Sequence, residues 1–205
     1  NLPGFSKAFD KVDHGILLHK LRDLGICGRM GVWLARFLYN RYQTMACDGH
    51  ISSKYLVTSG VPQGTVLGPV LFIILILDIS KGVSNGTRVS SFADDTRASR
   101  GIRSSVDHAQ LQQDLKLIYD WAERVNMFFN SDKFECLRYW PQKDIGDSFK
   151  TQHPYTDDLG NTIEEKEFLK DLGVQMSSDL TFTNHIDKVI SSCKKLSGGI
   201  LRTFK

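Results

Sequence analysis

Residues 88–99 read RVSSFADDTRAS and place two adjacent aspartates, Asp94 and Asp95, in the middle of the stretch. Residues 88–92 predict a strand and residues 96–99 its return, so the aspartates are expected in a tight turn. Like charges side by side raise the energy unless a cation lies with them. Hard oxygen ligands on a rigid turn suit Mg²⁺, which binds one or two protein carboxylates together with substrate phosphates. For an isolated Asp-Asp pair, a solvated turn without a ligand is the alternative.

Two further blocks lie upstream of this turn, and one of them carries groups that can meet a ligand. Residues 59–72 read SGVPQGTVLGPVLF, in which glycines let the backbone approach a ligand closely and Gln63 offers an amide to a base or sugar edge. Residues 5–14 read FSKAFDKVDH and predict a strand that runs into a helix, with Asp13 as the N-cap. Taken alone, the first block is a loop that enters a helix. Two Mg²⁺ ions about 4 Å apart, bound at the carboxylate pair, can drive in-line phosphoryl transfer.

The composition is that of an ordinary globular protein. Of the 205 residues, 41% are hydrophobic and 24% are charged, which excludes whole-chain disorder, collagen and coiled coil. The net charge of +3 is too small to indicate a nucleic-acid-binding protein by itself. Residues 1–103 carry +6 and residues 104–205 carry −3, and five basic residues with no acid follow Asp187. Because the chain begins with Asn1 rather than Met, we expect a piece of a longer protein.

The cysteines and the longest apolar run exclude several other classes. The four cysteines are far apart and form no Cys-x-x-Cys pair, which argues against a disulfide framework and a zinc site and favours reduced thiols. The longest apolar run, residues 66–77, has 12 residues, whereas a bilayer core needs about 20. We therefore expect a buried helix there and no membrane span.

Helical and extended patterns alternate along the chain. Apolar residues at helical spacing predict helices over residues 16–24, 32–38, 66–77, 111–125 and 183–200. Extended patterns predict strands over residues 42–47, 54–58, 88–92, 96–99, 134–140 and 168–176, with a strand end over residues 4–9. Thr183 or Asn184 is expected to cap the last helix, and residues 141–162 predict a loop or hairpin. The predicted class is α+β with an antiparallel sheet.

Five blocks in this order resemble the reverse transcriptase of non-LTR (LINE-type) retrotransposons. FSKAFDKVDH looks like motif A of that family, SGVPQGTVLGPVLF like motif B and FADD like motif C. WAERVNMFFNSDKFECL at residues 121–137 looks like motif D. LKDLGV at residues 169–174 looks like motif E, which DLTFTNHI at residues 179–186 continues. The five blocks cover nearly the whole chain, so the resemblance is specific.

The resemblance implies the palm of a right-handed polymerase, in which an antiparallel sheet is flanked by helices. Residues 1–180 would form the palm with motifs A to E, and residues 181–205 the start of the thumb helix. The fingers, with their triphosphate-contacting basic residues, would precede residue 1 and are absent. A basic helix with an apolar underside can lie along a phosphate backbone, which gives the charges after Asp187 a role. A solvated helix face is the alternative.

The resemblance also assigns roles to individual residues. Asp94 aligns with the metal-ligating aspartate of motif C, and Asp95 aligns with its weaker neighbour. Phe9 aligns with the aromatic gate that excludes a ribose 2′-OH from the nucleotide pocket. Gln63 and Gly64 align with the motif B contacts to the template and the incoming nucleotide.

Two further roles concern the leaving group and the primer. Lys133 resembles the motif D lysine, a candidate general acid for the pyrophosphate leaving group. A surface lysine beside a strand is the alternative. Leu172 and Gly173 match the primer-grip turn of motif E. Trp121, within motif D, is expected in the core rather than at a ligand.

The chain departs from the family at motif A. The family reads Asp-Phe-Ser-Lys-Ala-Phe-Asp, and its first aspartate bridges both metal ions, whereas this sequence has Gly4 there. Loss of this carboxylate is expected to reduce the rate by on the order of 10³-fold or more. Asp10 and Asp13 belong to the turn and the following helix, so neither is placed to substitute. A smaller departure is Leu77, where the family commonly has Asn.

The sequence thus predicts an RNA-directed DNA polymerase domain that uses Mg²⁺ or Mn²⁺ and binds an RNA template, a DNA primer and dNTPs. The family implies a nuclear or cytoplasmic ribonucleoprotein inside the cell and no membrane contact. Gly4 leaves open a second hypothesis, a catalytically dead or decayed palm that binds at most nucleic acid or a protein. It also leaves open a splice or gene-model boundary before Phe5. A nucleotide cyclase would share only the two-metal chemistry, and motifs B and E argue against it.

Overall fold

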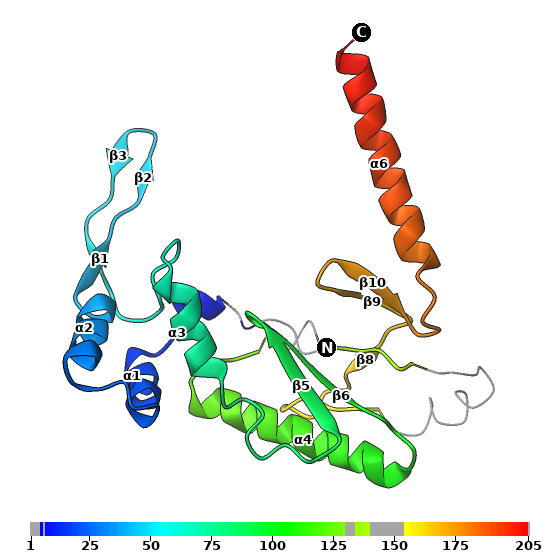
Figure 1. Cartoon of the computed structure of the whole chain (residues 1–205), viewed down its shortest axis with the longest axis horizontal. Helices are drawn as coiled ribbons and strands as arrows, with labels where there is room; N and C mark the ends of the chain where they lie inside the picture. Colours follow the sequence, from blue (N-terminus) through cyan, green and yellow to red (C-terminus); the bar gives the residue numbers. More distant parts are fainter. Residues whose placement is uncertain (1–4, 6, 130–133, 140–153, 205) are drawn as a thin grey trace. The chain divides into compact units, whose positions relative to one another are not determined.

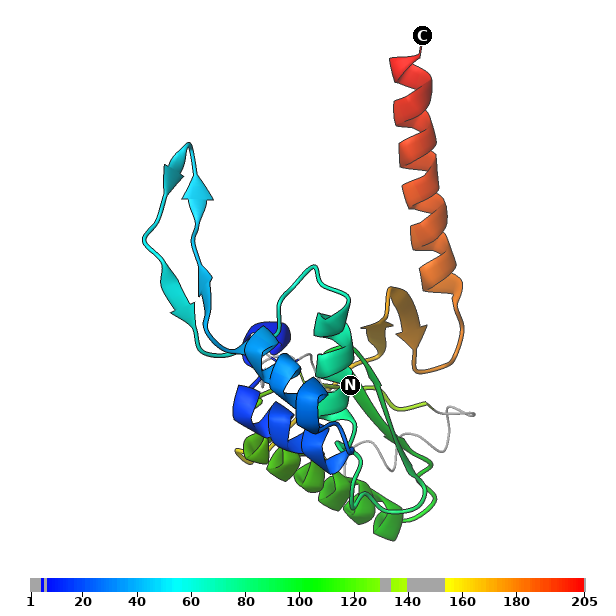
Figure 2. The same cartoon turned by 60° about the vertical axis from the view of Figure 1, so that its left-hand side comes forward.

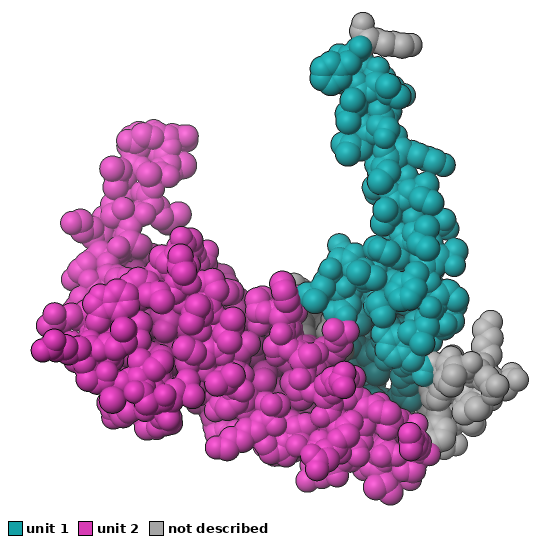
Figure 3. All heavy atoms as spheres, viewed as in Figure 1, with its two compact units in different colours: residues 1, 134–205 teal, residues 2–133 magenta. Residues whose placement is uncertain are grey.

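The chain folds into helices and short two-stranded sheets, as expected for the α+β class (Figure 1). The computed structural model describes residues 5, 7–129, 134–139 and 154–204. The chain divides into two units, which Figure 3 colours separately. One unit spans residues 2–133, and the other spans residues 134–205 with residue 1.

The unit of residues 2–133 carries the three blocks that resemble motifs A, B and C. Its described elements are, in chain order, the 3₁₀ turn η1 (Ala8–Asp10), helices α1 (His14–Asp23) and α2 (Gly28–Leu38), strands β1 (Arg41–Gln43), β2 (Ala46–Cys47), β3 (His50–Ile51) and β4 (Tyr55–Val57), helix α3 (Leu67–Ile76), strands β5 (Thr87–Phe92) and β6 (Asp95–Arg100), and helix α4 (Ser105–Arg124). Apolar side chains from these helices and from the segment after α4 form its core. The most deeply buried include Leu17, Leu21, Leu38, Leu71, Phe72, Leu75, Ile118 and Met127.

Helix α1 begins and ends where the sequence predicts. The carboxylate of Asp13 accepts the N–H of Ile16 at 2.9 Å, a cap that contributes about 1 kcal/mol. After the helix, Gly25 adopts a φ of +82°, a conformation that glycine reaches without steric penalty. The N-cap prediction for Asp13 is confirmed.

Helix α3 begins at Leu67, and Pro69 lies in its first turn, where a missing N–H leaves no helical bond unmade. Leu71 and Leu75 are buried, whereas Ile73 is exposed. The predicted buried helix is therefore buried on one face.

Strands β5 and β6 form an antiparallel hairpin whose last pair is Phe92 opposite Asp95. Ala93 and Asp94 make the two-residue turn, and Ala93 adopts a φ of +51°. The strand–turn–strand prediction is confirmed with one difference, because Asp95 is the first residue of β6 rather than a turn residue. Figure 1 shows this hairpin lying along α4.

A second ribbon extends from α2 (Figure 2). Strand β1 pairs with β4 and β2 with β3, both antiparallel, which confirms the two strands predicted around Asp48-Gly49. Each strand is interrupted, since the hydroxyl of Ser52 accepts the N–H of Met45 at 2.9 Å in place of a backbone partner.

The unit of residues 134–205 holds the remaining described elements. They are strands β7 (Glu135–Cys136), β8 (Glu164–Glu165), β9 (Phe168–Asp171) and β10 (Val174–Ser177), and helix α6 (Thr183–Thr203). The single strand predicted over residues 168–176 is wrong. Leu172 and Gly173 have φ values of +45° and +91°, which turn the chain into the hairpin β9–β10. Two successive positive φ angles are typical of a type I′ turn, whose twist matches that of the paired strands.

The predicted antiparallel pairing is confirmed for most strands of the described residues, although these residues form no single continuous sheet. Their strands pair in five separate two-stranded sheets, four of them antiparallel and one, β7–β8, parallel. The strand end expected over residues 4–9 is reduced in the described part to a bridge between Phe5 and Phe129. Lys7 has a φ of +52°, and the turn η1 follows it, so the extended backbone stops there. Of the strand expected over residues 134–140, the described residues 134–139 form only β7, and residue 140 lies outside the described residues.

Helix α6 begins at Thr183, but neither Thr183 nor Asn184 caps it, so that prediction is wrong. The preceding turn is held by Asp179 instead. Hydrogen bonds from the hydroxyl of Ser177 and from the backbone and hydroxyl of Thr181 lower the pKa of Asp179 to about 2. This acid therefore supplies a fixed turn before the helix.

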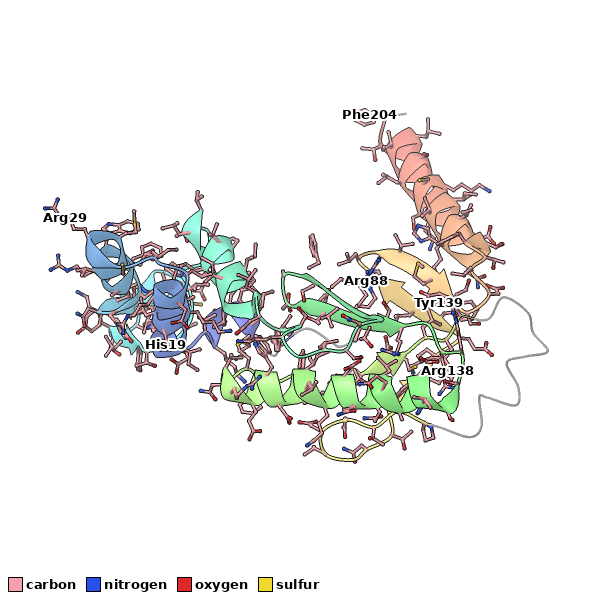
Figure 4. The ribbon with its side chains drawn as sticks, turned by 60° about the horizontal axis from the view of Figure 1, so that its bottom comes forward. His19, Arg29, Arg88, Arg138, Tyr139 and Phe204 are labelled. Carbon is pink, nitrogen blue, oxygen red and sulfur yellow. The ribbon has the colours of Figure 1, made fainter. Side chains whose placement is uncertain are left out.

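The apolar stripe predicted on α6 is exposed in this structure. Figure 4 shows side chains projecting around the helix as far as Phe204, and the described residues of α6 include no buried one. Ile186 is 53% exposed and Val189 is 46% exposed. Within the described ranges, no helix combines the length and apolar character needed to cross a bilayer.

A buried charge ties the β5–β6 hairpin to α4. Asp114 on α4 is 0% exposed and accepts the backbone N–H of Ser84 at 2.9 Å and the hydroxyls of Ser84 and Thr87 at 2.6 and 2.5 Å. Arg100 on β6 lies 3.8 Å from the same carboxylate. Burial raises the pKa of Asp114, but the hydrogen bonds from Ser84 and Thr87 outweigh it, so the net pKa lies below the ordinary value.

We predict that Asp114→Ala lowers the free energy of unfolding by about 3 kcal/mol, because donors on Ser84 and Thr87 lose their buried acceptor. Since the pKa is depressed in the folded state, this contribution is present above the unfolded value of about 3.9 and is lost as the pH falls through the folded value. Urea unfolding of both proteins at neutral and acidic pH measures the difference. Asp120→Ala, at an exposed site on α4, is the control and should change stability by less than about 0.5 kcal/mol. An equal loss of unfolding free energy in both variants would contradict the role of Asp114 as an anchor for the hairpin.

Candidate active site

The loops of motifs A and B are joined by backbone hydrogen bonds. The N–H of Val61 donates to the carbonyl of Phe9, and the N–H of Gly60 donates to the carbonyl of Val12, both at 2.8 Å. The hydroxyl of Ser59 donates to the carbonyl of Asp10 at 2.8 Å. Segments about 50 residues apart in sequence thus form one rigid pair of loops.

This close approach depends on Gly60. Its φ is +85°, and a Cβ added there would lie 2.8 Å from the Cα of Asp10 and 2.9 Å from the carbonyl oxygen of Phe9. Such contacts are too short for real atoms and involve backbone, which cannot swing aside. Gly64 also has a positive φ, +72°, but a Cβ there would meet nothing within 4 Å. The two glycines therefore differ in role: Gly60 permits packing, and Gly64 leaves open space.

The ring of Phe9 is held by a stacked contact with α3. Its centroid lies 4.6 Å from that of Phe72, with an interplanar angle of 22°. Phe72 is fully buried, whereas Phe9 is half-buried. Stacked aromatic pairs contribute about 0.5–1.5 kcal/mol beyond burial, so one face of Phe9 is fixed.

Gln63 is exposed, yet its side chain is oriented. Its Nε2 donates to Oδ1 of Asp10 at 2.8 Å. The residues predicted at the nucleotide pocket, Phe9, Gln63 and Gly64, therefore lie on one pair of joined loops.

Asp94 and Asp95 are positioned by the β5–β6 hairpin of the same unit. Asp94 lies in the turn and is half-buried, whereas Asp95 is exposed at the start of β6. The positive φ of Ala93 is uncommon for a residue with a Cβ and stores about 1 kcal/mol or more of strain. Strain of this kind persists only where the surroundings hold it, here the paired strands and the anchor on Asp114.

The two carboxylates fit a magnesium ion in part. Mg²⁺ uses one or two protein carboxylates and completes its shell with waters and phosphate oxygens, which adjacent aspartates on a rigid turn can supply. Among the residues that the structure describes, no group of three or more His, Cys, Asp and Glu side chains gathers around a common point. The remaining ligands would therefore have to come from substrate, water or undescribed residues.

The predicted primer-grip residues lie in the other unit. Leu172 and Gly173 form the β9–β10 turn, and a cavity of about 550 Å³ lies between this hairpin and α6. Within that unit, the N–H of Gln175 donates to Nδ1 of His185 at 3.3 Å and so connects hairpin to helix. The cavity is lined by Phe168, Leu169, Lys170, Gly173, Gln175, His185, Lys188, Val189, Ser192 and Cys193.

Two predicted site residues, Gly4 and Lys133, lie outside the described residues. Trp121 is buried as predicted, at 2% exposed, and its Nε1 donates to Asp78 at 2.8 Å. Asp78 also pairs with Lys20. Burial raises the pKa of Asp78. The hydrogen bonds from Lys20 and Trp121 lower it by more, so the net pKa lies below its ordinary value. Asp78, which follows α3, thus connects that helix to α1 through Lys20 and to α4 through Trp121.

Three contacts that hold the loop of residues 59–64 were not predicted from the sequence. The carbonyl of Gly60 accepts Nε2 of His14 at 2.8 Å and a guanidinium N–H of Arg41 at 2.9 Å, and Asp10 holds Gln63. Only His14 carried a signal, since a histidine on the apolar side of α1 predicts a buried polar contact. The partners are 19 to 53 residues apart, so no local pattern identifies them.

Comparison with known proteins identifies the family. The family model described as reverse transcriptase (RNA-dependent DNA polymerase) matches residues 5–176. The chain belongs to this reverse transcriptase family. The resemblance on which motifs A to E were assigned is thus confirmed at the level of the family.

Curated relatives of this reverse transcriptase chain are encoded by mobile elements of Drosophila melanogaster. The RNA-directed DNA polymerase from mobile element jockey is 28% identical over 190 residues, covering 89% of this chain and 20% of the relative. The probable RNA-directed DNA polymerase from transposon X-element is 28% identical, with coverage of 89% and 20%. The putative 115 kDa protein in type-1 retrotransposable element R1DM is 23% identical, with coverage of 98% and 19%. The chain spans about a fifth of the length of these relatives.

We predict that Gly60→Ala destabilises this reverse transcriptase domain by at least about 2 kcal/mol more than Gly64→Ala. Both alanines require an unfavourable positive φ, which costs about 1 kcal/mol, but only the Cβ at position 60 strikes backbone. Chemical denaturation of the two variants and the parent measures the difference. Equal losses would show that the joined loops can separate freely.

Proposed function

We propose that this chain is the palm of an RNA-directed DNA polymerase, which adds dNTPs to the 3′-OH of a DNA primer on an RNA template. One observation carries the proposal: in a chain of the reverse transcriptase family, Asp94 lies at a tight turn of a hairpin that a buried charge anchors. Residues 1–180 would form the palm, and residues 181–205 the start of the thumb helix.

In the proposed reaction, the primer 3′-oxygen attacks the α-phosphorus of a dNTP and pyrophosphate leaves. Asp94 would bind Mg²⁺ or Mn²⁺, and Asp95 would be the weaker ligand. When bound, the ions stabilise charge on the attacking and leaving oxygens. Lys133 would donate a proton to the leaving pyrophosphate.

Phe9 would select the sugar. Because its ring stacks on the fully buried Phe72, it cannot rotate away without losing that contact, so a ribose 2′-OH in the pocket would clash with it. Gln63 and Gly64 would contact the template and the incoming nucleotide. The open space beside Gly64 supports this role, because a strand can approach the backbone there.

The unit of residues 134–205 would hold the primer. Leu172 and Gly173 would form the primer grip, and Lys170 and Lys188 beside the cavity would neutralise phosphates. Because the relatives are about five times as long, we propose that the fingers and the rest of the thumb belong to a parent polyprotein. The proposed location is a nuclear or cytoplasmic ribonucleoprotein, without membrane contact.

We also propose that polymerisation by this sequence is strongly impaired, because Gly4 stands where the family has a metal-bridging aspartate. A glycine offers no oxygen ligand, and loss of such a ligand costs on the order of 10³-fold in rate. Asp10 is engaged with Gln63 and Asp13 with the first turn of α1, which leaves neither carboxylate ready to replace it.

The test replaces the matching residues of the jockey polymerase with this chain, so that the missing segments are supplied, and measures primer extension on an RNA template with Mg²⁺. We predict that Gly4→Asp raises the extension rate by on the order of 10³-fold. In the Gly4→Asp background, Asp94→Asn should abolish the gain, and Asp95→Asn should reduce it less. Asp158→Asn, at an exposed loop residue, is the control and should leave the rate unchanged.

Each proposal has its own contrary result. Equal rates for the Gly4 and Gly4→Asp chimaeras would overturn the impairment. A rate that survives Asp94→Asn would overturn the assignment of the metal-binding turn. A folded Gly4→Asp chimaera that binds primer–template without extending it would leave this palm as a binding module.

A further inference from the structure

The amide of Gln63 has one orientation in this structure. Its Nε2 lies 2.8 Å from Oδ1 of Asp10. A carboxylate only accepts hydrogen bonds, so the NH₂ group must face Asp10 and the carbonyl Oε1 must face elsewhere. An acceptor, rather than a donor, is thereby offered to whatever approaches the exposed end of Gln63.

We propose that Asp10 is a positioning residue for nucleic-acid binding: it orients Gln63 so that Oε1 accepts a hydrogen bond from a nucleotide, either from a sugar hydroxyl or from a base N–H. The inference rests on the proposed function and adds a residue that the motif assignment leaves without a role. Asp10 itself need not touch the nucleotide.

Asp10 is held as firmly as the side chain that it orients. Its carbonyl accepts the hydroxyl of Ser59 at 2.8 Å, and its Cα packs against Gly60, where no Cβ fits. Backbone and side chain of Asp10 are therefore both fixed to the motif B loop.

The other side of the loop is fixed by a shared acceptor. The carbonyl of Gly60 accepts Nε2 of His14 on α1 and a guanidinium N–H of Arg41 on β1. Since a carbonyl only accepts, Nε2 of His14 carries a proton, and this side chain is 2% exposed. Two donors from different elements converge on one oxygen, so the loop cannot slide past Asp10 without leaving them unpaired.

The exposure of the pair favours a role toward a ligand over a role in stability. Asp10 and Gln63 are both exposed, and an exposed polar pair contributes little to folding because water competes for both groups. The loop is already held by Ser59, Gly60 and Val61. Loss of the carboxylate should therefore change binding more than it changes unfolding.

The experiment compares Asp10→Ala with Asp10→Asn in the 205-residue chain. Both variants remove the negative charge, which by itself would strengthen binding to nucleic acid, but only Asn retains an oxygen that can accept Nε2 of Gln63. The probe is a fluorescent duplex of an RNA template and a DNA primer. We predict that Asp10→Ala binds it about fivefold more weakly than Asp10→Asn, with the same unfolding midpoint.

A double-mutant comparison tests the route of the effect. Gln63→Ala should weaken binding, and in that background Asp10→Ala and Asp10→Asn should bind equally. A difference that persists without Gln63 would overturn the inference. Asp23→Ala, on the exposed side of α1, is the control for charge removal elsewhere. Repeating the titration with a DNA template, which lacks 2′-hydroxyls, distinguishes the two donors. Weaker binding of the DNA template would assign the donor to a sugar 2′-hydroxyl, and unchanged binding would assign it to a base N–H.

A second readout separates this inference from the proposed function. In ¹⁵N-labelled chain, the side-chain amide signals of Gln63 should shift in Asp10→Ala and stay near their original positions in Asp10→Asn. Unchanged signals in both variants would overturn the inference whatever the binding result. Shifted signals in a chain that binds no nucleic acid would show that Asp10 orients Gln63, but would contradict both a role of this pair in nucleic-acid binding and the proposed function.

Discussion

The carboxylate of Asp114 is the interaction on which the proposed metal site depends. A fully buried charge is tolerable only when its lone pairs are satisfied, and here the backbone of Ser84 and two hydroxyls satisfy them. These donors lie just before and at the start of β5, and Arg100 lies at the end of β6. The base of the hairpin is thereby fixed to α4. Six cross-strand residue pairs connect this base to the turn at Asp94 and so fix the position of the turn.

A second constraint, the lack of a side chain at Gly60, joins the loops proposed to recognise the nucleotide. Because Gly60 lies against Asp10, the backbone bonds to Phe9 and Val12 can form. Phe9 is then placed for stacking on Phe72, and Gln63 is placed beside Asp10. Sugar selection and template contact would therefore respond together to any change at this junction. The hairpin is held by a carboxylate whose pKa is depressed, so its anchor on Asp114 weakens as the pH falls through that pKa.

Local signals predicted much of this fold, and non-local pairing explains what they missed. The cap at Asp13, the helices and the β5–β6 turn follow from patterns within a few residues, and all were predicted. The hairpin at Leu172-Gly173 was missed as secondary structure, since leucine rarely adopts a positive φ and its flanking residues look like one strand. The separation into two-stranded sheets depends on which strand edges meet, which no single stretch specifies. Likewise, the contact between Asp10 and Gln63 spans 53 residues.

Under the proposed function, the glycine at position 4 would bear on chemistry more than on architecture. The bonds that hold Phe9, Gln63 and Asp94 run through Gly60, Val61, Phe72 and Asp114, none of which depends on a carboxylate at position 4. In the proposed site, an aspartate at position 4 would supply oxygen ligands to the metal ions rather than packing contacts. Its loss can therefore remove catalysis while the loops and the hairpin persist. Such a scaffold would still present the ring of Phe9, the oriented amide of Gln63 and the turn at Asp94, so under the proposed function binding and chemistry would be separable.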